Sequence, residues 1–305
     1  MTTRLLSISP SELRKLSSKQ ILEAIALSEG RVLAAETVCI SQPLLTDVTN
    51  AELAASLSAD ILILNIFDVD KPVIIGLPKC QPKDTIRKLK ELTGRLIAIN
   101  LEPVDPGAGE EEIWQMSKGR VANAANALKA KKMGVDMIVI TGNPGNHVSN
   151  EGITKAIRQI RKKLGDDIIL ITGKMHASGS LTEAGTNIIT KKDVEEFAQA
   201  GADIVLFPAP GTVPGITTEY IRELVNYAHE LGCLTLTAIG TSQEGSSKET
   251  IREIALMAKM TGTDIHHIGD SGYVGIALPE NIMEYSMTIR GARHTYRKMA
   301  QSVNR

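Results

Sequence analysis

Short apolar runs recur along the chain, and each ends at a polar or turn-forming residue. The runs are rich in Ile, Leu and Val and show little polar alternation, which is typical of strands in a parallel sheet that is covered on both faces. Longer segments with helical character separate them, so strand and helix alternate. The runs are Val32–Ile40, Ile61–Ile66, Leu96–Leu101, Met137–Thr141, Ile168–Thr172, Ile204–Phe207, Leu234–Ile239 and Ile265–Ile268.

Several of the helical segments lead into the next strand through a Gly-x-Asp turn. Glycine at this point is a helix C-cap, and its left-handed conformation directs the chain into the strand. These turns are Gly134-Val135-Asp136, Gly201-Ala202-Asp203 and Gly262-Thr263-Asp264. The predicted helices include Lys118–Met133, Asn150–Leu164, Lys191–Ala200, Thr217–Leu231 and Ser247–Thr261.

Eight strand candidates separated by helices predict a (β/α)8 barrel of the TIM type. The alternative is an open doubly wound sheet, which usually has fewer strands and a glycine-rich dinucleotide turn after the first one. The first run here continues into Glu36-Thr37-Val38-Cys39 without such a turn, so the barrel is favoured and no nucleotide cofactor is expected. We expect one TIM-barrel domain over residues 1–305, with N-terminal helices in 1–30, the barrel in 31–278 and a C-terminal helix in 279–305.

Both ends of the chain carry helix signals outside the alternation. Ser9 with Glu12, and Ser17 with Gln20, form capping-box patterns that predict two short helices, which we expect to cover the bottom of the barrel or a neighbouring molecule. The terminal segment from Pro279 to Gln301 predicts a basic helix, and a bend is expected at Gly291 because glycine weakens helices. This helix is expected to pack on the barrel, to face solvent, or to contact another subunit.

Composition excludes several classes of protein. The chain has 34 Lys and Arg against 35 Asp and Glu, so it lacks the concentrated positive charge that nucleic-acid binding needs. No apolar run approaches the roughly 20 residues that span a bilayer. The N-terminus has no apolar signal-peptide core, and the three cysteines are too widely spaced for a disulfide framework or a zinc site. We therefore expect a cytoplasmic protein that binds neither nucleic acid nor membrane, and a homo-oligomer.

Acidic residues follow the first three predicted strands, at the end of a barrel where chemistry takes place. Glu36, Asp68, Asp70 and Glu102 lie at neighbouring strand ends. Carboxylates in such number suit Mg²⁺, the candidate cofactor, and without a metal they would raise one another's pKa, which suits acid-base catalysis. The sequence predicts that these four residues hold the metal and that Glu36 and Glu102 are catalytic. The alternative is that they bond to loop N–H groups or to nearby lysines.

The loops after the seventh and eighth predicted strands are rich in glycine and hydroxyl groups. In many barrels these two loops bind phosphate through backbone N–H groups. Glu244 and Asp270 depart from that pattern, because their charge repels an anion unless it is turned away, and the alternative is that the loops only form turns and cap a helix. The predicted phosphate-binding residues are Gly240, Thr241, Ser242, Gly269, Ser271 and Gly272.

Lys174 and His176 follow the fifth predicted strand and are spaced to share one face. A desolvated lysine at a barrel strand end forms Schiff bases, and otherwise it is a fixed cation for a substrate carboxylate. We expect both side chains to be catalytic, either as an enolate-stabilising or proton-transferring pair or, for Lys174, as a Schiff-base lysine. His147 is interpreted as a loop residue, and only one of the adjacent His266 and His267 can face the barrel axis.

From Val32 to Tyr273 the chain resembles the phosphate-binding TIM barrels, the ribulose-phosphate-binding group in particular, on the glycines of the last two loops. Asp68-Val69-Asp70 is also similar to the Asp-x-Asp magnesium site of the phosphoenolpyruvate mutase and isocitrate lyase superfamily. There Thr-Gly-Tyr-Gly follows, whereas Lys71-Pro72-Val73 follows here, and the Lys-Cys-Gly-His loop of that superfamily is missing. As a whole the chain resembles uncharacterised bacterial TIM-barrel proteins.

These features predict a lyase or isomerase that acts on a small phosphorylated or carboxylated, and therefore anionic, metabolite with the help of Mg²⁺. Proton abstraction beside a carbonyl is the expected chemistry. Two alternatives stay open: a non-catalytic protein that binds a phosphorylated metabolite or assembles with partners, and a Schiff-base aldolase that uses Lys174.

Overall fold

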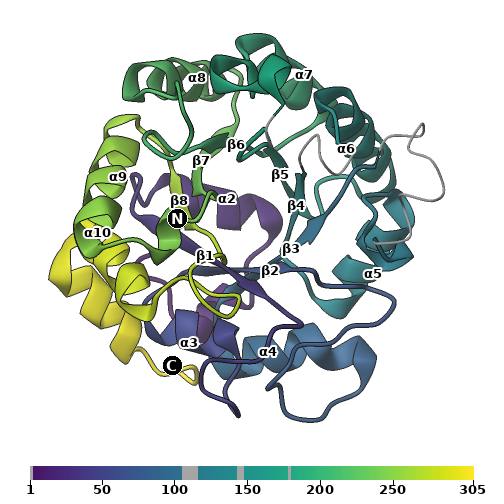
Figure 1. Cartoon of the computed structure of the whole chain (residues 1–305). Helices are drawn as coiled ribbons and strands as arrows, with labels where there is room; N and C mark the ends of the chain where they lie inside the picture. Colours follow the sequence, from purple (N-terminus) through teal and green to yellow (C-terminus); the bar gives the residue numbers. More distant parts are fainter. Residues whose placement is uncertain (1–2, 105–115, 143–147, 178–179) are drawn as a thin grey trace.

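Eight parallel strands close into one barrel in the computed structural model, in the order β1 to β8 (Figure 1). The structure describes residues 3–104, 116–142, 148–177 and 180–305. Each strand pairs with the next one along the chain, and β8 returns to pair with β1. The predicted (β/α)8 barrel is confirmed. The strands are β1 Val32–Val38, β2 Ile61–Asn65, β3 Leu96–Leu101, β4 Met137–Thr141, β5 Ile169–Gly173, β6 Ile204–Pro208, β7 Leu234–Ile239 and β8 Ile265–Ile268.

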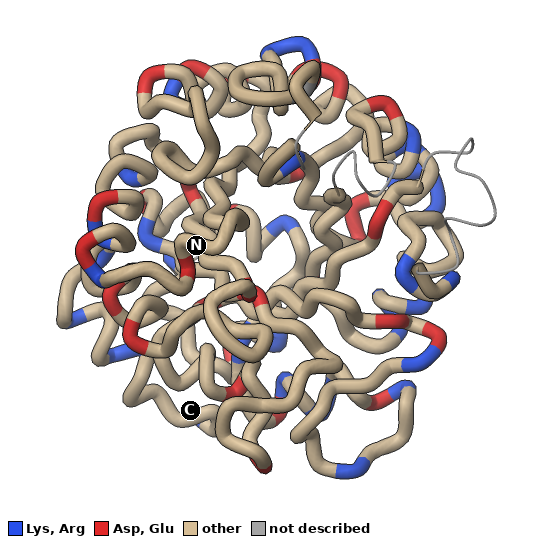
Figure 2. Tube along the Cα trace, in the orientation of Figure 1, with Lys and Arg blue, Asp and Glu red and all other residues tan. Residues whose placement is uncertain are grey.

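A ring of helices surrounds the barrel, and residues of both charge signs alternate around it (Figures 1 and 2). The outer face of each strand and the inner face of each helix share one large apolar core. Within the described ranges, no helix is long and apolar enough to cross a membrane. The helices of the ring are α3 Asn50–Ser56, α4 Thr85–Thr93, α5 Ala124–Met133, α6 Asn150–Leu164, α7 Lys191–Ala200, α8 Thr218–Glu230, α9 Lys248–Met260 and α10 Pro279–Ala300.

Local backbone geometry corrects the predicted start of α5 and confirms the predicted bend in α10. The helix expected over Lys118–Met133 begins only at Ala124, because the Asn123 side chain accepts the N–H of Asn126 and caps α5 there. Residues Lys118–Arg120 form a separate 3-10 turn. In α10 the bend predicted at Gly291 is present, since this residue has φ 74° and ψ 169°.

The N-terminal segment closes the bottom of the barrel. Both predicted capping boxes are present, and they start α1 (Pro10–Leu13) and α2 (Ser18–Ala26). Apolar side chains of this segment, among them Leu5 and Ile25, form one cluster with the residues that fill the barrel interior. The N-terminal segment therefore fills the lower end of the barrel interior with apolar side chains.

Alternate residues of each strand fill the barrel interior. In β1, Val32 and Ala34 point inward, and in β2 the same holds for Ile61 and Ile63. Successive side chains of a strand point to opposite faces, so the next inward position in β1 is Glu36. The switch from apolar to polar inward residues marks the floor of the barrel mouth.

The Gly-x-Asp turns have a second role at the bottom of the barrel. The aspartate that precedes each even-numbered strand accepts the backbone N–H of a residue in the preceding odd-numbered strand, over 2.8–2.9 Å. Before β2 the sequence is Ser58-Ala59-Asp60, and Ser58 adopts the positive φ of 83° that glycine has in the other turns. The pairs are Asp60 with Leu33, Asp136 with Ile97, Asp203 with Leu170 and Asp264 with Thr235.

Gly173 ends β5 where this strand approaches β6 very closely. A Cβ atom at Gly173 would lie 2.0 Å from the carbonyl oxygen of Leu206, which belongs to the backbone and cannot move aside. We expect Gly173→Ala to lower the free energy of unfolding by about 3 kcal/mol, measured by urea denaturation. Gly232→Ala is the matched control, because Gly232 also has a positive φ (82°) but no atom within 4 Å of the added Cβ. It should cost about 1 kcal/mol, and equal losses for the two variants would contradict the clash.

Candidate active site

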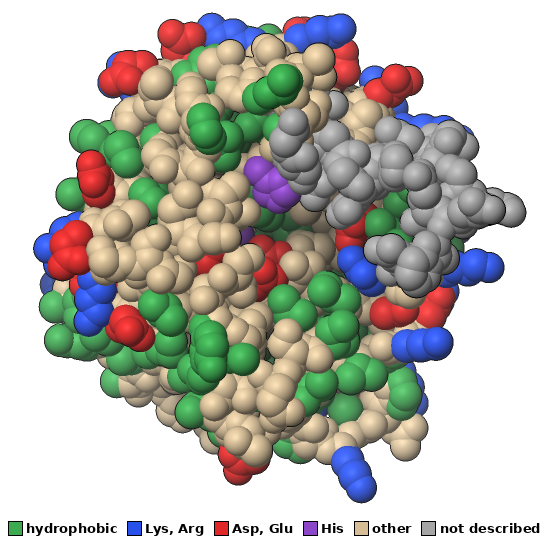
Figure 3. Space-filling view, viewed as in Figure 1, with side chains coloured by type: hydrophobic (Ala, Val, Ile, Leu, Met, Phe, Trp, Pro, Cys, Tyr) green, Lys and Arg blue, Asp and Glu red, His purple; other side chains and the backbone are tan. Residues whose placement is uncertain are grey.

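A polar cavity of about 220 Å³ opens at the carboxyl ends of the strands. Figure 3 shows this face, with Asp and Glu side chains gathered in the hollow at its centre and a histidine beside them. The volume suits a metabolite of a few carbon atoms rather than a larger ligand. The described lining residues are Glu36, Asn65, Asn100, Glu102, Thr141, Gly142, Met175, His176, Gly240, Glu244, Gly269, Asp270 and Ser271.

Glu36 forms the centre of a buried polar chain at the floor of the cavity. Its Oε2 lies 3.0 Å from Nε2 of His267 on the neighbouring strand β8, and its Oε1 accepts the Nδ2 of Asn100 over 2.5 Å. His267 and Glu36 are 0% and 4% exposed. The Nε2 of His267 therefore carries the proton that Glu36 accepts, and Glu36 keeps its carboxylate in one orientation.

The two adjacent histidines of β8 face opposite sides, as the alternation predicts. His266 points outward, where its ring contacts the hydroxyl of Tyr285 (3.3 Å) and the carbonyl of Gly30 (3.1 Å). Burial lowers the pKa of His266 to about 4, so this histidine is neutral near pH 7. Only His267 takes part in the mouth.

Asp270 lies directly after β8 and beside Glu36. Its Oδ2 accepts the Nδ2 of Asn65 over 2.7 Å. Burial, together with the negative charge of Glu36, raises the pKa of Asp270 to about 6, although the bond from Asn65 acts in the opposite direction. A carboxyl group that changes its protonation state this close to neutral pH is suited to proton transfer.

Glu244 belongs to the loop after β7 and is fully buried. Its Oε1 accepts the backbone N–H of Ser271 over 3.2 Å, whereas its Oε2 has no hydrogen-bond partner. Burial raises the pKa of Glu244 above its ordinary value. The negative charge of Glu36 raises the pKa of Glu244 further, whereas the nearby His267 acts in the opposite direction.

The four carboxylates predicted to hold Mg²⁺ do not converge. Glu36 and Glu102 line the cavity, and Glu102 forms an ion pair with Arg120. Asp68 instead accepts the backbone N–H groups of Asp70 (2.7 Å) and Lys71 (3.1 Å), and Asp70 pairs with Lys129 at 2.5 Å. Among the residues that the structure describes, no group of three or more His, Cys, Asp or Glu side chains is arranged to hold a metal ion. Asp68 and Asp70 therefore bond to loop N–H groups and to a lysine, which is the alternative given for them above. Mg²⁺ binding stays a prediction.

The loops after β7 and β8 meet, as predicted for a phosphate site. The two loops are so close that a Cβ atom added at Gly245 would lie 3.1 Å from the carbonyl oxygen of Gly272. Gly240, Gly269 and Ser271 line the cavity. Two of the groups predicted to bind phosphate, however, already have partners within the protein. The Ser271 N–H binds Glu244, and the Thr241 hydroxyl donates to the Thr212 carbonyl over 2.8 Å. Phosphate binding thus stays a prediction.

Lys174 and His176 are placed differently from one another. Lys174 is 1% exposed and lies outside the described lining of the cavity. His176 lines the cavity, and burial lowers its pKa, so its imidazole is neutral near pH 7. β5 ends at Gly173, before either of them, so the strand period does not fix where their side chains point, and their shared catalytic role stays a prediction. His147 lies outside the described residues.

The sequence predicts catalytic roles for Glu36 and His176, but for none of the other residues at the centre of the mouth. Asp270 and Glu244 depart from the predicted phosphate site because of their charge, and the sequence gives His267, Asn65 and Asn100 no catalytic role. The strand period gives the missing signal. Counting in steps of two from the apolar inward positions reaches Glu36, Asn65, Asn100, Thr141 and His267.

The fold and this mouth define the class: a (β/α)8 barrel with an acidic, partly buried cavity at the carboxyl ends of its strands. The family model described as Domain of unknown function (DUF7916) matches residues 6–305. The chain belongs to this family. A search of curated proteins finds no significant match.

Solved structures of other TIM barrels are similar to the chain. A 2,3-dimethylmalate lyase, described as a member of the PEP mutase/isocitrate lyase superfamily, has a TM-score of 0.50 and 15% identity over 85% of this chain and 82% of its own. Thiamine phosphate pyrophosphorylase from Pyrococcus furiosus has a TM-score of 0.49 and 13% identity, over 87% and 100%. Deoxyribose phosphate aldolase from Aeropyrum pernix has a TM-score of 0.47 and 14% identity, over 86% and 97%. At these identities the likeness to the lyase shows a shared fold.

Proposed function

We propose that the chain is a lyase or isomerase that moves a proton beside a carbonyl group of a small metabolite bound in the barrel mouth. The observation that carries this proposal is the position of Asp270, which lines the cavity against the Glu36–His267 pair. In barrels of this type, catalytic side chains come from the carboxyl ends of several strands. Here the polar groups come from β1, β2, β3, β4 and β8 and from residues that follow β3, β5, β7 and β8.

Asp270 is the base in this proposal. With a pKa of about 6 it is mostly ionised at pH 7 and still basic enough to accept a proton from an activated carbon. Asn65 holds one of its oxygens, which fixes the direction of the carboxylate. Glu36 supports the same role, because its negative charge keeps the pKa of Asp270 high while His267 and Asn100 hold Glu36 in place.

His176 is the acid that faces the carbonyl oxygen. A neutral imidazole donates a hydrogen bond to an oxygen that becomes negative without adding a full positive charge. Removal of the proton by Asp270 then gives an enolate whose oxygen is stabilised by the His176 N–H. In an isomerase, a hydroxyl on the deprotonated carbon passes its proton to the enolate oxygen and becomes the new carbonyl, while Asp270 returns its proton to the former carbonyl carbon. In a lyase, the enolate re-forms the carbonyl as the group on the next carbon leaves with the bonding electron pair, so one arrangement serves both reactions. Each step uses only groups of the protein.

The structure gives less support to three narrower predictions: an anionic substrate, assistance by Mg²⁺ and a Schiff base on Lys174. An anionic substrate, phosphorylated or carboxylated, would meet four carboxyl groups in the mouth. Assistance by Mg²⁺ would need a rearrangement of the carboxylates, and a Schiff base would need Lys174 to reach the cavity. The lyase among the structural neighbours shares the fold and therefore agrees with lyase chemistry without fixing it.

Solvent deuterium exchange tests the proposal. The full chain is incubated in D₂O with hydroxyacetone, aminoacetone or pyruvate, three carbonyl compounds of similar size and different charge, and the loss of C–H signal is followed by proton NMR. We expect exchange above the buffer rate for at least one compound, increasing between pH 5 and pH 7 as Asp270 ionises. A rate equal to that of buffer alone for all three compounds would contradict the proposal.

A further inference from the structure

The charge of the mouth restricts what it can bind. Four carboxyl groups line the cavity, and none of the described lining residues is Lys or Arg. Among the ion pairs described, Glu102 pairs with Arg120 and Glu36 with His267, and none of them involves Glu244 or Asp270. The segments 105–115, 143–147 and 178–179, which the structure does not describe, contain no Lys or Arg in the sequence. A ligand that enters this cavity therefore meets a negative field, which favours a cation.

Two buried polar atoms of the lining point to the same kind of ligand. Glu244 is 0% exposed and its Oε2 has no hydrogen-bond partner, and Asn100 is 8% exposed with an unpartnered Oδ1. The amide of Asn100 is oriented by its Nδ2, which donates to Glu36, so the free atom is an acceptor. A buried acceptor without a donor costs free energy. The ligand should therefore bring N–H groups, which phosphate and carboxylate groups lack.

An apolar groove continues from this cavity. It has a volume of about 820 Å³, and it shares His176 and Gly240 with the mouth. Its walls come from the loops after β5, β6 and β7 and include Ala177, Leu181, Val213 and Pro214. Leu181 is 91% exposed, so it adds apolar surface that a ligand in the groove can cover. The groove thus offers a place for an apolar chain next to the acidic mouth.

We infer that the ligand of this site is an organic primary ammonium compound with an apolar chain of several carbons. Its ammonium group donates to Glu244 Oε2 and Asn100 Oδ1 in the mouth, and its chain lies in the groove against Leu181, Val213 and Pro214. The inference rests on the proposed function for the identity of the mouth as the active site, and it narrows the substrate from a small metabolite to an amine. It replaces the anion expected from the sequence.

Binding calorimetry on the full chain tests the charge and the chain of the ligand separately. The probes are butylammonium, hexylammonium, hexanoate and 1-hexanol. We expect hexylammonium to bind more tightly than butylammonium, by about fourfold for each added methylene group. Hexanol should bind more weakly than hexylammonium, and hexanoate should show no binding. Hexanoate binding as tight as that of hexylammonium, or no binding of either ammonium ion, would overturn the inference.

Two variants assign the effects to the two parts of the site. Glu244→Gln keeps the acceptor for Ser271 and should weaken hexylammonium binding about tenfold while leaving hexanol binding unchanged. Leu181→Ser should reduce the difference between the hexyl and butyl ions. Leu256→Ser, at a leucine of α9 that is 47% exposed, is the matched control and should change neither. Equal effects of Leu181→Ser and Leu256→Ser would remove the groove from the site.

Two further readouts separate this inference from its alternatives. Tight Mg²⁺ binding that displaces hexylammonium would assign the negative field to a metal ion and overturn the inference. Deuterium exchange with pyruvate but not with aminoacetone would leave the acid-base function intact and overturn only the amine. Ammonium binding without any exchange would support the amine site and contradict the acid-base function.

Discussion

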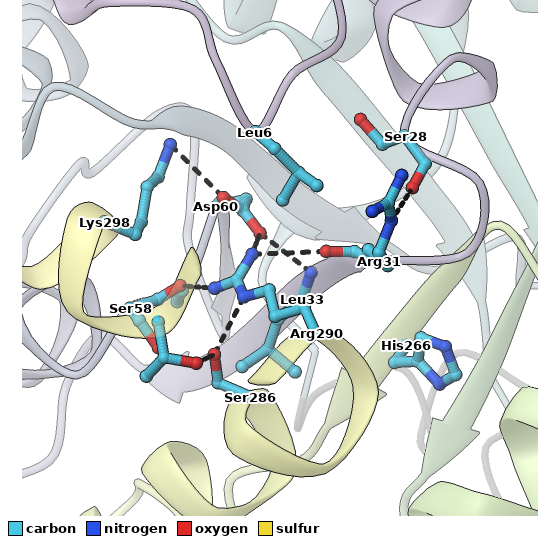
Figure 4. A network of polar contacts seen from close by, with 12 residues as sticks. Leu6, Ser28, Arg31, Leu33, Ser58, Asp60, His266, Ser286, Arg290 and Lys298 are labelled. Carbon is cyan, nitrogen blue, oxygen red and sulfur yellow. Dashed lines mark hydrogen bonds and ion pairs between the residues drawn. The ribbon is translucent and has the colours of Figure 1, made fainter. Parts of the chain in front are cut away.

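Asp60→Asn should lower the free energy of unfolding by about 3–5 kcal/mol, the largest stability effect that we expect from a single substitution in this chain. Asp60 is completely buried at the bottom of the barrel, just before β2 (Figure 4). Its Oδ2 accepts Nη1 of Arg290 at 2.5 Å, and its Oδ1 lies 3.2 Å from Nζ of Lys298. Both cations come from α10, so this cluster fixes the C-terminal helix to the barrel.

The expected loss is large because the cations cannot reach water. The Arg290 side chain is 0% exposed and that of Lys298 is 6% exposed. Burial alone would raise the pKa of Asp60, but the charges of Arg290 and Lys298 hold it below its ordinary value. Burial lowers the pKa of Lys298 to about 8 despite the nearby Asp60. Without the carboxylate, two buried positive charges would have no counter-charge.

Asp136→Asn is the matched control for this prediction. Asp136 occupies the same position before β4 and accepts the N–H of Ile97, but its partner Lys90 has a side chain 23% exposed, and the carboxylate is itself 16% exposed. This variant should lose about 1 kcal/mol, as expected for a pair in contact with solvent. Urea denaturation of both variants and of the wild type gives the comparison. Equal losses of unfolding free energy in the two variants would show that burial of the Asp60 cluster does not increase its contribution to stability.

Asp270→Asn should reduce the deuterium-exchange rate by about 10²–10⁴-fold, the contribution that a positioned general base typically makes. The asparagine keeps the size of the side chain but cannot accept a proton. The wild-type rate should increase as pH rises through about 6, and the variant should lose that dependence. Asp166→Asn removes a carboxylate that is 99% exposed and should keep full activity. A variant at position 270 with an unchanged rate would exclude Asp270 as the base.

Stability measurements separate a lost base from a lost fold. The pKa of Asp270 is raised in the folded protein, so the ionised carboxylate costs stability, and this cost develops as pH rises from about 4 to about 6. Asp270→Asn removes the cost and should be at least as stable as the wild type at pH 8. Lower stability at pH 8 would mean that a loss of exchange reflects damage to the mouth.

Much of the fold is readable from the sequence because strand burial and helix capping are local. The apolar runs locate all eight strands to within about two residues, and the boundaries of α6 and α7 agree with the prediction. The two capping boxes and the bend at Gly291 follow from single residues with strong backbone preferences. The start of α5 is harder to predict from the sequence, because Asn123 is one of several residues there that could cap a helix.

The site was only partly readable, because it depends on which partner each side chain finds. Strand order correctly brings Glu36 near Glu102, and the loops after β7 and β8 together. The pairing of Asp70 with Lys129, which lies 59 residues away on α5, has no signal in the sequence. The same is true of Glu244, whose carboxylate turns inward and takes the N–H expected to bind phosphate.

The most direct test of the account is the titration of the Asp270 carboxyl group itself. Carbon-13 NMR of protein labelled at aspartate carboxyl groups, with Asp270 assigned by the absence of its signal in Asp270→Asn, follows the protonation state from pH 3 to pH 8. The account predicts a midpoint of about 6. It also predicts that Glu36→Gln moves this midpoint toward the ordinary value, since the charge of Glu36 contributes to the shift. A midpoint near 4 in the wild type would contradict the claim that the barrel mouth is a proton-transfer site.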